Sequence, residues 1–312
     1  MADLPDPAPQ EHEAVLELRY AALNPADRYL AEGQYPAKPP LPHILGRDGI
    51  GTVVQVGVGA SDVRVGDRRI ILRGDVGVKR AGTFAQRVSV PEANLVEMPP
   101  GWSEQESAGA TLVYLTAYQA LTMWGPLPPS AVVLVTGASG GVGVATVQLA
   151  AALGYTVVAL SRNAAKSERL RQLGATAAFN PEDSQWRTQL KAFLAQRRVD
   201  LAIDNIGGKL LPEVIDMLGE LGKVSLVGRL AGPVPSFNTA TLFFRRIRMG
   251  GVAVGASTAA ESRENWRHVL ALLARTGARP QVDKVFPFDQ LPKAFERLAQ
   301  GPMGKVLLSV GQ

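Results

Sequence analysis

The sequence predicts an α/β protein with two domains, one rich in short β-strands and one built on a doubly wound parallel sheet. Its length of 312 residues is enough for about two ordinary domains, each with its own core. The first hundred residues are rich in Gly, Pro and Val and contain short runs in which apolar and polar residues alternate. From about residue 131, strand-like and helix-like segments alternate instead, which is typical of a parallel sheet covered by helices.

Short antiparallel strands are expected in the first region. Three runs carry the pattern: 49–57 (GIGTVVQVG), 67–74 (DRRIILRG) and 83–90 (TFAQRVSV). The residue pattern changes after Trp102, where Ser103 and Glu106, three positions later, form a capping box that starts a helix. Helical spacing of apolar residues continues to Gly125 and Pro126, so we expect one helix that leads out of the first domain.

The second region alternates regularly between strands and helices. Expected strands lie at 131–137, 156–161, 176–180, 199–207 and 222–228. Expected helices lie at 142–154, 164–175, 186–196 and 210–219. This order predicts the parallel sheet. After Gly255 the texture changes again, to an amphipathic helix at 264–276, a mixed segment at 284–301 and a closing strand at 304–310.

A glycine-rich turn, TGASGGVG, joins the strand at 131–137 directly to the following helix. Glycines suit a dinucleotide there, because the turn is tight and a pyrophosphate must approach bare N–H groups at the positive end of a helix. The alternative is an ordinary loop, but the flanking strand, helix and second strand favour dinucleotide binding. The predicted contacts in this turn are Gly137, Ser139, Gly140, Gly141, Val142 and Gly143.

The end of the second strand, VVALSRN, indicates which dinucleotide binds. An Asp or Glu about 20 residues after the glycines usually holds a free ribose 2′-OH. Here Ser161 and Arg162 stand at that point, with Lys166 in the next helical turn, and these groups complement a 2′-phosphate that a carboxylate would repel. We therefore predict NADP(H) over NAD(H). The alternative is that Arg162 and Lys166 only solvate the start of a helix.

Composition and charge exclude several other classes of protein. There is no cysteine, and the three histidines are scattered, so neither a disulfide framework nor a thiolate metal site is possible and we predict no metal. The net charge of +5 is dispersed along the chain, which argues against nucleic acid as a partner. No apolar run approaches the roughly 20 residues of a membrane helix, and the first residues lack a secretory signal. We therefore expect a cytoplasmic protein with no membrane partner.

Eight motifs follow one another along the chain: 23–36 (LNPADRYLAEGQYP), 44–59 (ILGRDGIGTVVQVGVG), 63–69 (VRVGDRR), 82–101 (GTFAQRVSVPEANLVEMPPG), 115–121 (LTAYQAL), 137–143 (GASGGVG), 204–208 (DNIGG) and 304–310 (GKVLLSV). In this order they resemble the medium-chain dehydrogenases/reductases, and within them the zinc-free quinone oxidoreductases related to zeta-crystallin. The resemblance implies a GroES-like catalytic domain at 1–110 and 256–312 and a Rossmann NADP(H)-binding domain at 111–255.

Zinc-dependent members of this superfamily carry GHE where this chain has Gly46, Arg47 and Asp48. The His is absent, and no Cys is present to complete either family zinc site. Without a Lewis acid to form an alkoxide, simple alcohol dehydrogenation is disfavoured. Hydride transfer from NADPH to an acceptor that delocalises negative charge, such as a quinone or an α,β-unsaturated carbonyl, remains chemically easy.

The resemblance also implies residues around the nicotinamide and the acceptor. Asn24 and Tyr35 match family positions near both, and in related enoyl-thioester reductases a tyrosine matching Tyr35 is assigned as the proton donor. The alternatives are that Tyr35 is only an aromatic loop residue, or that its ring stacks on the nicotinamide. Asp27 and Asp48 look like a carboxylate pair but rank as structural. The remaining implied cofactor contacts are Thr116, Asn205, Gly228, Gly251 and Val252.

These observations predict an NADPH-dependent, zinc-independent quinone reductase, and the resemblance implies a homodimer. An enoyl-thioester or other ene reductase of the same fold is the first alternative. An NADPH-binding protein without turnover, serving as a sensor or structural protein, is the second. The acceptor pocket is expected to depend on the loops at 72–80 and 231–241, because the fold alone does not fix the substrate.

Overall fold

The structure, a computed structural model, describes residues 3–72, 74–232 and 238–311. Parts of both loops expected to shape an acceptor pocket, residue 73 and residues 233–237, lie outside the described residues. Two compact units are present. Unit 1 comprises Met1–Val113, Val254–His268 and Arg279–Gln312, and unit 2 comprises Tyr114–Ala253 and Val269–Ala278. The helix α9 (Ala259–Thr276) therefore contributes to both units, whereas the predicted division assigned all of it to the first domain.

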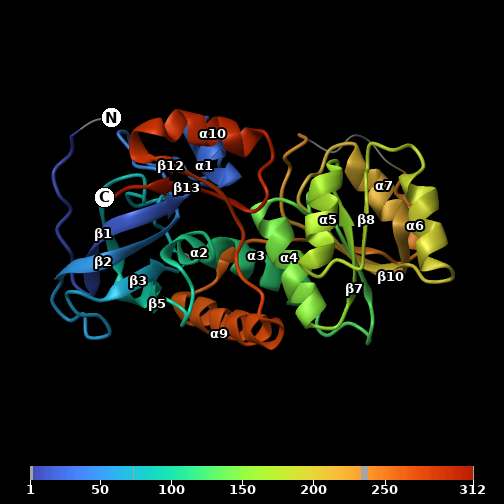
Figure 1. The fold of residues 1–312 in the computed structure, drawn as a ribbon, viewed down its shortest axis with the longest axis horizontal. Helices are drawn as coiled ribbons and strands as arrows, with labels where there is room; N and C mark the ends of the chain where they lie inside the picture. Colours follow the sequence, from blue (N-terminus) through green and yellow to red (C-terminus); the bar gives the residue numbers. More distant parts are fainter. Residues whose placement is uncertain (1–2, 73, 233–237, 312) are drawn as a thin grey trace. The chain divides into compact units, whose positions relative to one another are not determined.

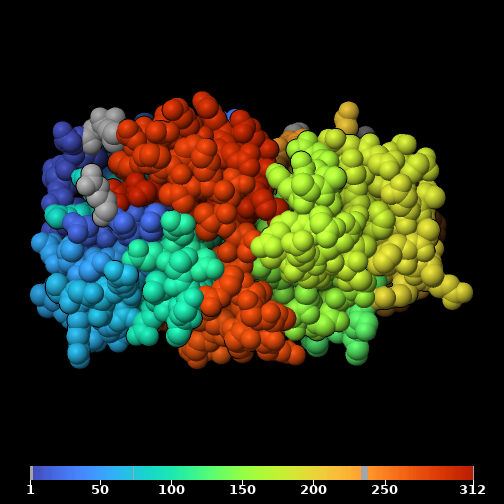
Figure 2. Space-filling model, in the orientation of Figure 1, coloured from blue at the N-terminus to red at the C-terminus, as the bar shows by residue number. Residues whose placement is uncertain are grey.

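Unit 1 is built on a seven-stranded sheet in the order β12-β13-β1-β2-β3-β5, with β4 also paired to β1. All pairs are antiparallel except β12 with β13, so the predicted short antiparallel strands are confirmed. The last strand lies beside the first, and the red C-terminal segment meets the blue N-terminal one in Figures 1 and 2. The strands are β1 (Glu13–Ala22), β2 (Asp48–Val56), β3 (Arg68–Ile71), β4 (Arg87–Pro91), β5 (Leu95–Glu97), β12 (Val282–Pro287) and β13 (Lys305–Ser309).

Short helices and single turns connect these strands. The helices are α1 (Pro25–Ala31), α2 (Glu104–Ala108) and α10 (Leu291–Ala299), and the turns are η1 (Glu92–Asn94), η2 (Val254–Ala256) and η3 (Phe288–Gln290). The helix α9 begins five residues before the predicted 264, because Thr258 and Glu261 form a capping box that was not predicted. None of the helices in the described part of the chain is long and apolar enough to cross a membrane.

The single helix expected from Ser103 to Gly125 is wrong, because the structure has two helices there, α2 and α3 (Thr111–Thr122). The predicted capping box is present, with the Glu106 N–H donating to Ser103 Oγ over 3.2 Å. The chain turns at Gly109, where a Cβ atom would lie 3.0 Å from Cγ of the buried Lys305 side chain. Asp48 then accepts a hydrogen bond from the Leu112 N–H at 3.3 Å and restarts the helix. Both causes are tertiary contacts.

Unit 2 is built on six parallel strands in the order β11-β10-β9-β6-β7-β8, with helices on both faces (Figure 1). The predicted doubly wound sheet is confirmed. The strand order reverses between β6 and β9, which is where ligands of such sheets bind. The strands are β6 (Val132–Val135), β7 (Thr156–Leu160), β8 (Ala177–Phe179), β9 (Val199–Asp204), β10 (Leu218–Leu226) and β11 (Arg248–Gly251). The helices are α4 (Gly141–Ala152), α5 (Ala164–Gln172), α6 (Trp186–Leu194), α7 (Leu210–Met217) and α8 (Ala240–Phe244).

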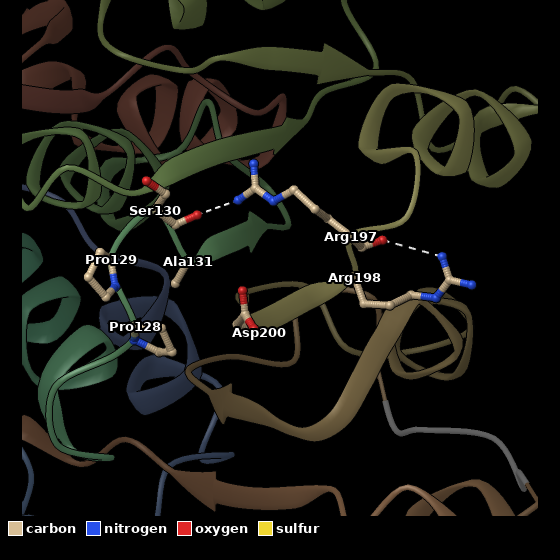
Figure 3. A pocket seen from close by; sticks show the side chains of 7 residues that line it. All are labelled: Pro128, Pro129, Ser130, Ala131, Arg197, Arg198 and Asp200. Carbon is tan, nitrogen blue, oxygen red and sulfur yellow. Dashed lines mark hydrogen bonds between the residues drawn. The ribbon is translucent and has the colours of Figure 1, made fainter.

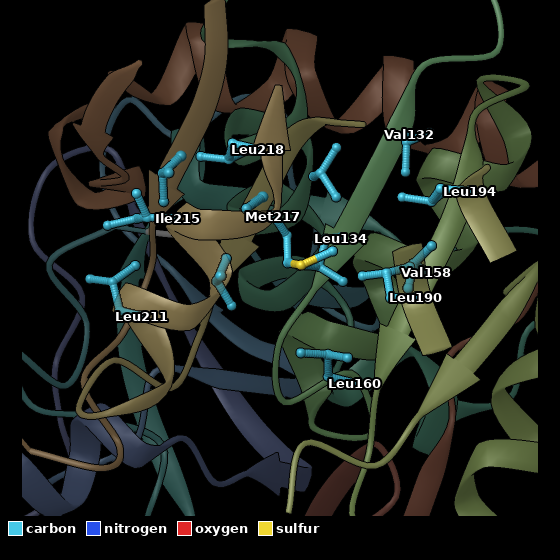
Figure 4. Close-up of a cluster of buried hydrophobic side chains, with 14 of the residues drawn as sticks. Val132, Leu134, Val158, Leu160, Leu190, Leu194, Leu211, Ile215, Met217 and Leu218 are labelled. Atoms are coloured by element: carbon cyan, nitrogen blue, oxygen red, sulfur yellow. The ribbon is translucent and has the colours of Figure 1, made fainter. Parts of the chain in front are cut away.

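The core of unit 2 lies between the sheet and its helices (Figure 4). Its buried side chains include Leu134 and Leu160 from the strands, Leu190 from α6 and Ile215 from α7. Strands covered on both faces are apolar on both, which is why β6 is the apolar run VVLV and β7 continues after Thr156 as VVAL. Each fully buried Leu or Ile contributes about 1.5–3 kcal/mol. This core holds the carboxyl ends of the strands, where the predicted nucleotide contacts lie, in fixed register.

Candidate functional site

The glycine-rich turn follows β6 and ends at Gly140, the N-cap of α4. Two positions of the turn require glycine, because other atoms of the protein pack closely against them. A Cβ on Gly137, whose φ is +56°, would lie 2.7 Å from Ile206 Cδ1, and one on Gly143 would clash with the Gly137 carbonyl. These two glycines let the turn and the helix approach the sheet closely.

Gly140 differs from its neighbours in the turn. A Cβ there would meet only the Gly137 oxygen, at 3.5 Å, so its outer side is open. The N–H groups of Gly141, Val142 and Gly143 form the first turn of α4 and have no carbonyl four residues before them within the helix. Ser139 lies half-buried beside them. An open glycine at the positive end of a helix fits a pyrophosphate.

A hydrogen-bonded web joins the ends of β6 and β9. Thr136 Oγ1 donates to Asp204 Oδ1 at 2.7 Å and accepts from the Asn205 N–H at 2.9 Å. Asp204 also accepts from the N–H groups of Ile206 and Gly207, and burial raises its pKa against these hydrogen bonds. Thr136 and Asp204 were not predicted. Asp204 stood in the quoted DNIGG motif and was the available signal.

Asn205 presents a buried acceptor at this edge. Its Nδ2 donates to the Thr136 carbonyl at 2.8 Å, whereas its Oδ1 is enclosed and has no hydrogen-bond partner among the described residues. A buried acceptor without a partner lowers the stability of the fold by about 1–3 kcal/mol, so binding of a donor to it is favourable. A ribose hydroxyl or a carboxamide N–H of a dinucleotide supplies one, and the site therefore fits the group that the fold implies. Gly228, after β10, is packed against the Asn205 carbonyl, 2.7 Å from where its Cβ would lie.

The end of β7 carries the residues predicted to read a 2′-phosphate. Ser161 is buried, Lys166 is half-buried in the first turn of α5, and the Arg162 side chain is 68% exposed. Arg162 Nη1 lies 3.3 Å from an oxygen of Glu182, an acid that was not predicted here because it follows the next strand in the sequence. An exposed pair of this kind contributes about 0–1 kcal/mol, so Arg162 can exchange Glu182 for an anionic ligand. Asn163 caps α5 by accepting from the Lys166 N–H at 3.0 Å.

The remaining predicted cofactor contacts are spread over two places. Gly251 ends β11 with open space on its Cβ side, and the Val252 N–H donates to the Leu226 carbonyl at 2.9 Å. Because the strands are parallel, the ends of β6, β7, β9, β10 and β11 share one edge, and the structure brings their predicted residues there. Thr116 lies instead on α3, where it is buried.

Unit 1 contains a buried cluster of four charged side chains and one amide, which we call the charge cluster: Asp27, Arg47, Asp48, Lys305 and the linking Asn24. Each is at most 5% exposed. Arg47 Nε donates to Asp27 at 3.0 Å, and Lys305 Nζ donates to Asp48 at 3.1 Å. Asn24 links the two pairs, because its N–H donates to Asp27 at 2.8 Å while its Nδ2 donates to Asp48 at 2.9 Å and its Oδ1 accepts from Lys305 at 2.6 Å.

Burial dominates the electrostatics of the charge cluster. It raises the pKa of Asp27 from 3.8 to about 6, and the Asp48 carboxylate adds to the rise. The Arg47 charge, the Asn24 N–H and Lys305 oppose it, in that order. Asp27 is therefore ionised at neutral pH and takes up a proton in mildly acidic solution. The predicted structural ranking of Asp27 and Asp48 agrees with these contacts, whereas Arg47 and Lys305 were not predicted to be partners.

Tyr35 lies at the border of the charge cluster. Its ring is half-buried and covers the Arg47 guanidinium, with 4.4 Å between Cζ and the ring centroid. Asn24, the other residue predicted beside the acceptor, has its amide engaged by buried partners. A contact of Asn24 with an acceptor stays a prediction, as does the proton-donor role of Tyr35.

Zinc does not fit the charge cluster. The metal-binding His of GHE is Arg47 here, its guanidinium occupies a buried ion pair, and no Cys exists to act as a ligand. Among the described residues, no three His, Asp or Glu side chains gather into a group that could hold a metal ion.

A separate pocket of about 250 Å³ lies at the opposite end of the unit 2 sheet, before β6 and β9 (Figure 3). Arg197 donates to the Ser130 carbonyl there, and Asp200 accepts from the Val132 N–H at 2.7 Å. It lies away from the strand ends that carry the predicted contacts, so we assign it no part in the reaction.

The fold and these sites define a class: two-domain oxidoreductases with a nucleotide-binding parallel sheet and a β-rich partner domain. Residues 10–100 match the alcohol dehydrogenase GroES-like domain, and residues 141–275 match the zinc-binding dehydrogenase domain. The chain belongs to the medium-chain dehydrogenases/reductases, in the zinc-free family that resembles quinone oxidoreductases. The predicted family and oxidoreductase class are confirmed.

Relatives and solved structures agree with this placement. The chain is 30% identical to the synaptic vesicle membrane protein VAT-1 homolog of Rattus norvegicus, over 98% of this chain and 78% of that one. It is 28% identical to the quinone oxidoreductase of Lama guanicoe, over 98% and 92%. An NAD-dependent alcohol dehydrogenase structure matches with a TM-score of 0.90 at 29% identity, over 99% and 95%. The Escherichia coli quinone oxidoreductase complexed with NADPH matches in fold, with a TM-score of 0.89 at 24% identity, over 99% and 94%.

Proposed function

We propose that this protein is an NADPH-dependent reductase of quinones or similar conjugated carbonyl compounds that works without zinc. The observation that carries the proposal is Arg47, which stands in the position of a zinc-binding His and is ion-paired with Asp27 inside unit 1. Without a metal to stabilise an alkoxide, the acceptor must delocalise the negative charge that it gains. The similarity to a quinone oxidoreductase at 28% identity supports the same class of acceptor.

Bound NADPH would supply the hydride, and residues of unit 2 would hold and orient it. The first N–H groups of α4 would bind the pyrophosphate over the open side of Gly140. Asn205 Oδ1 would accept a hydrogen bond from the ligand and so lose the cost of standing unpaired. The proposed contacts are Thr116, Gly137, Ser139, Gly140, Gly141, Val142, Gly143, Ser161, Arg162, Lys166, Asn205, Gly228, Gly251 and Val252.

We infer a preference for NADPH over NADH from the end of β7. Arg162 and Lys166 supply two cations there, and Ser161 supplies a hydroxyl. Glu182 favours NADH instead, because its carboxylate lies 3.3 Å from Arg162 and could accept a hydrogen bond from a free ribose 2′-hydroxyl. The E. coli quinone oxidoreductase was solved with NADPH, whereas another neighbour is an NAD-dependent alcohol dehydrogenase. The ratio of kcat/KM for NADPH to that for NADH tests this preference.

Reduction of enals or enoyl thioesters is the second candidate, and Tyr35 favours it. The phenol oxygen has no hydrogen-bond partner among the described residues, so it can donate to an enolate. An enolate needs a proton on carbon, whereas a hydroquinone anion is stable enough to take one from water. Changing Tyr35 to Phe should therefore lower turnover of enals more than that of quinones, and a loss under about threefold for both would assign Tyr35 to packing.

We also propose a homodimer in the cytoplasm. Along β11 no further strand is paired in residues 3–72, 74–232 and 238–311, and on the neighbouring α8 Phe243 and Phe244 are 62% and 78% exposed. An unpaired sheet edge beside exposed aromatic rings suits an isologous contact with a second copy. Sedimentation at several protein concentrations tests this state. The cytoplasmic location rests on the sequence argument alone.

The test of function is steady-state oxidation of NADPH with a panel of quinones, enals and enoyl thioesters, in buffer with and without a chelator. We expect turnover of quinones or enals that the chelator leaves unchanged. Turnover of enoyl thioesters alone would favour the second candidate. Tight NADPH binding without turnover would favour a non-catalytic NADPH-binding protein. Zinc near one per chain, lost together with activity, would overturn the metal-free mechanism.

A further inference from the structure

Arg47 is a buried cation, and only two of its three guanidinium nitrogens donate hydrogen bonds within the described part of the chain. Its side chain is 3% exposed, Nε is fixed by Asp27 at 3.0 Å and Nη2 by the Ala26 carbonyl at 3.0 Å. The third nitrogen, Nη1, has no partner among the described residues, and it is not one of the fully enclosed atoms. A guanidinium held at two nitrogens is therefore fixed in position, and the N–H groups of its third nitrogen remain available to another acceptor.

The Tyr35 ring lies 4.4 Å from the Arg47 Cζ atom and covers one face of the guanidinium. The ring limits the approach of water to that face and leaves the edge of the guanidinium as the accessible side. The other buried cation of the charge cluster, Lys305, is engaged by Asn24 and Asp48. Lys305 Nζ thus uses two of its three N–H groups on these partners, whereas a whole guanidinium nitrogen of Arg47, Nη1, donates to neither Asp27 nor Ala26.

We propose that Arg47 is a catalytic residue whose Nη1 donates a hydrogen bond to the carbonyl oxygen of the acceptor and stabilises the negative charge that develops there. This inference rests on the proposed function. The acceptor gains a hydride at the carbon conjugated to its carbonyl, the C=C electron pair moves to form the enolate, and NADPH becomes NADP⁺. A proton from Tyr35 or water then completes the product. In a quinone the same oxygen becomes that of the hydroquinone anion.

The physical basis is preorganisation. A donor that is already oriented, in a place largely closed to water, needs no rearrangement when charge appears on the acceptor. Asp27 orients Arg47 by accepting a hydrogen bond from its Nε, so the Nη1 donors stay available. Arginine thus does by hydrogen bonding what zinc-dependent relatives do with a metal ion, but only for an oxygen whose charge is delocalised.

The first experiment removes the donor without leaving a buried charge unpaired. The double variant Asp27→Asn with Arg47→Gln is neutral at both positions, whereas Arg47→Gln alone leaves the fully buried Asp27 without its cation. We expect the double variant to lose about 10²- to 10³-fold in kcat with enals and quinones. The KM for NADPH should stay within threefold. The matched control is Arg69→Gln, which removes a cation of unit 1 paired with Asp67 and Glu97 and should keep full turnover.

The second experiment needs no turnover. The probe is 4-nitrophenol, whose phenolate form absorbs visible light and resembles a charge-delocalised oxygen anion. The original protein should bind the phenolate at least tenfold more tightly than the neutral phenol, and the double variant should lose this preference. Equal binding of both forms by the original protein, or an unchanged preference in the double variant, overturns the role of Arg47. If no acceptor is reduced but the phenolate preference follows Arg47, the proposed function fails and the anion site stands.

Discussion

The nucleotide-binding edge of unit 2 and the charge cluster of unit 1 are built in opposite ways. The edge of unit 2 consists of backbone N–H groups, glycines and one orphaned amide oxygen, and these groups have unused bonding capacity. In the charge cluster, most side-chain donors and acceptors are already ion-paired or hydrogen-bonded to one another. A ligand site needs unused groups, so the first region offers the N–H groups at the start of α4 beside the open side of Gly140, whereas the second offers little more than Arg47 Nη1 and Tyr35.

The two regions also differ in what they cost the fold. Glycine turns cost conformational entropy, which is repaid by close packing of a helix on a sheet. Buried charges cost desolvation, which is balanced only while every partner stays in place. The charge cluster should therefore be sensitive to loss of a single member, and the glycine turn should respond differently at its packed and its open positions.

The largest expected effect is in the charge cluster. Changing Lys305 to Met leaves the Asp48 carboxylate, which is 1% exposed, without its cation, and should lower the free energy of unfolding by about 3–5 kcal/mol. Adding Asp48→Asn removes the unpaired charge and should recover more than half of this loss. Urea unfolding of the three proteins measures both values. A loss below about 1 kcal/mol for Lys305→Met would show that water or another group compensates Asp48.

Two glycines of one turn sharpen the comparison between packing and binding. Gly143→Ala places a methyl group against the Gly137 carbonyl and should cost about 3 kcal/mol of stability. Gly140→Ala places it in open space, so stability should change by less than about 0.5 kcal/mol while NADPH affinity falls at least tenfold. Thermal unfolding and fluorescence titration with NADPH separate the two. Equal behaviour of both variants would mean that the open side of Gly140 is not the cofactor side.

The ion pair of Arg162 with Glu182, at the end of β7, should show a smaller effect. Arg162→Ala should raise the KM for NADPH about tenfold, which corresponds to about 1.4 kcal/mol, and leave that for NADH nearly unchanged. Glu182→Gln is the matched change on the other side of the same ion pair, and it should leave the KM for NADPH the same or lower. Added salt should weaken NADPH binding in the original protein more than in Arg162→Ala. If Arg162→Ala loses both cofactors equally, Arg162 only solvates the start of α5.

The smallest expected effect is a pH dependence from Asp27. Its pKa is raised to about 6 in the folded protein, above the unfolded value of 3.8, so the folded state binds the extra proton and is stabilised as pH falls. Between pH 7 and pH 5 the original protein should gain about 1 kcal/mol relative to Asp27→Asn, and this gain is lost again as pH rises through 6. Parallel urea curves at both pH values measure the difference. A difference that falls with acidity would mean that Arg47 lowers the pKa of Asp27 instead.

Most of the fold could be predicted from local pattern. The parallel sheet of unit 2, its turn at 137–143 and the strands β2, β3, β4 and β13 of unit 1 leave signals within short stretches, because strand and helix periods and glycine needs are local. The strands β1, β5 and β12 were not predicted. The predicted helix from Ser103 to Gly125 was wrong for the opposite reason. The break at Gly109 depends on Lys305, almost two hundred residues later, whose side chain occupies the space that a Cβ would need.

The sequence by itself determined that no cysteine or GHE histidine could hold zinc, that a glycine turn follows a buried strand, and that this strand ends without an acid. The tertiary structure decided the rest. It brought Glu182 beside Arg162, left Asn205 Oδ1 without a partner, and joined residues 24, 27, 47, 48 and 305 into one buried cluster. Charge pairing acts through space over a few ångströms, so residues distant in sequence reveal such partnerships only after the chain has folded.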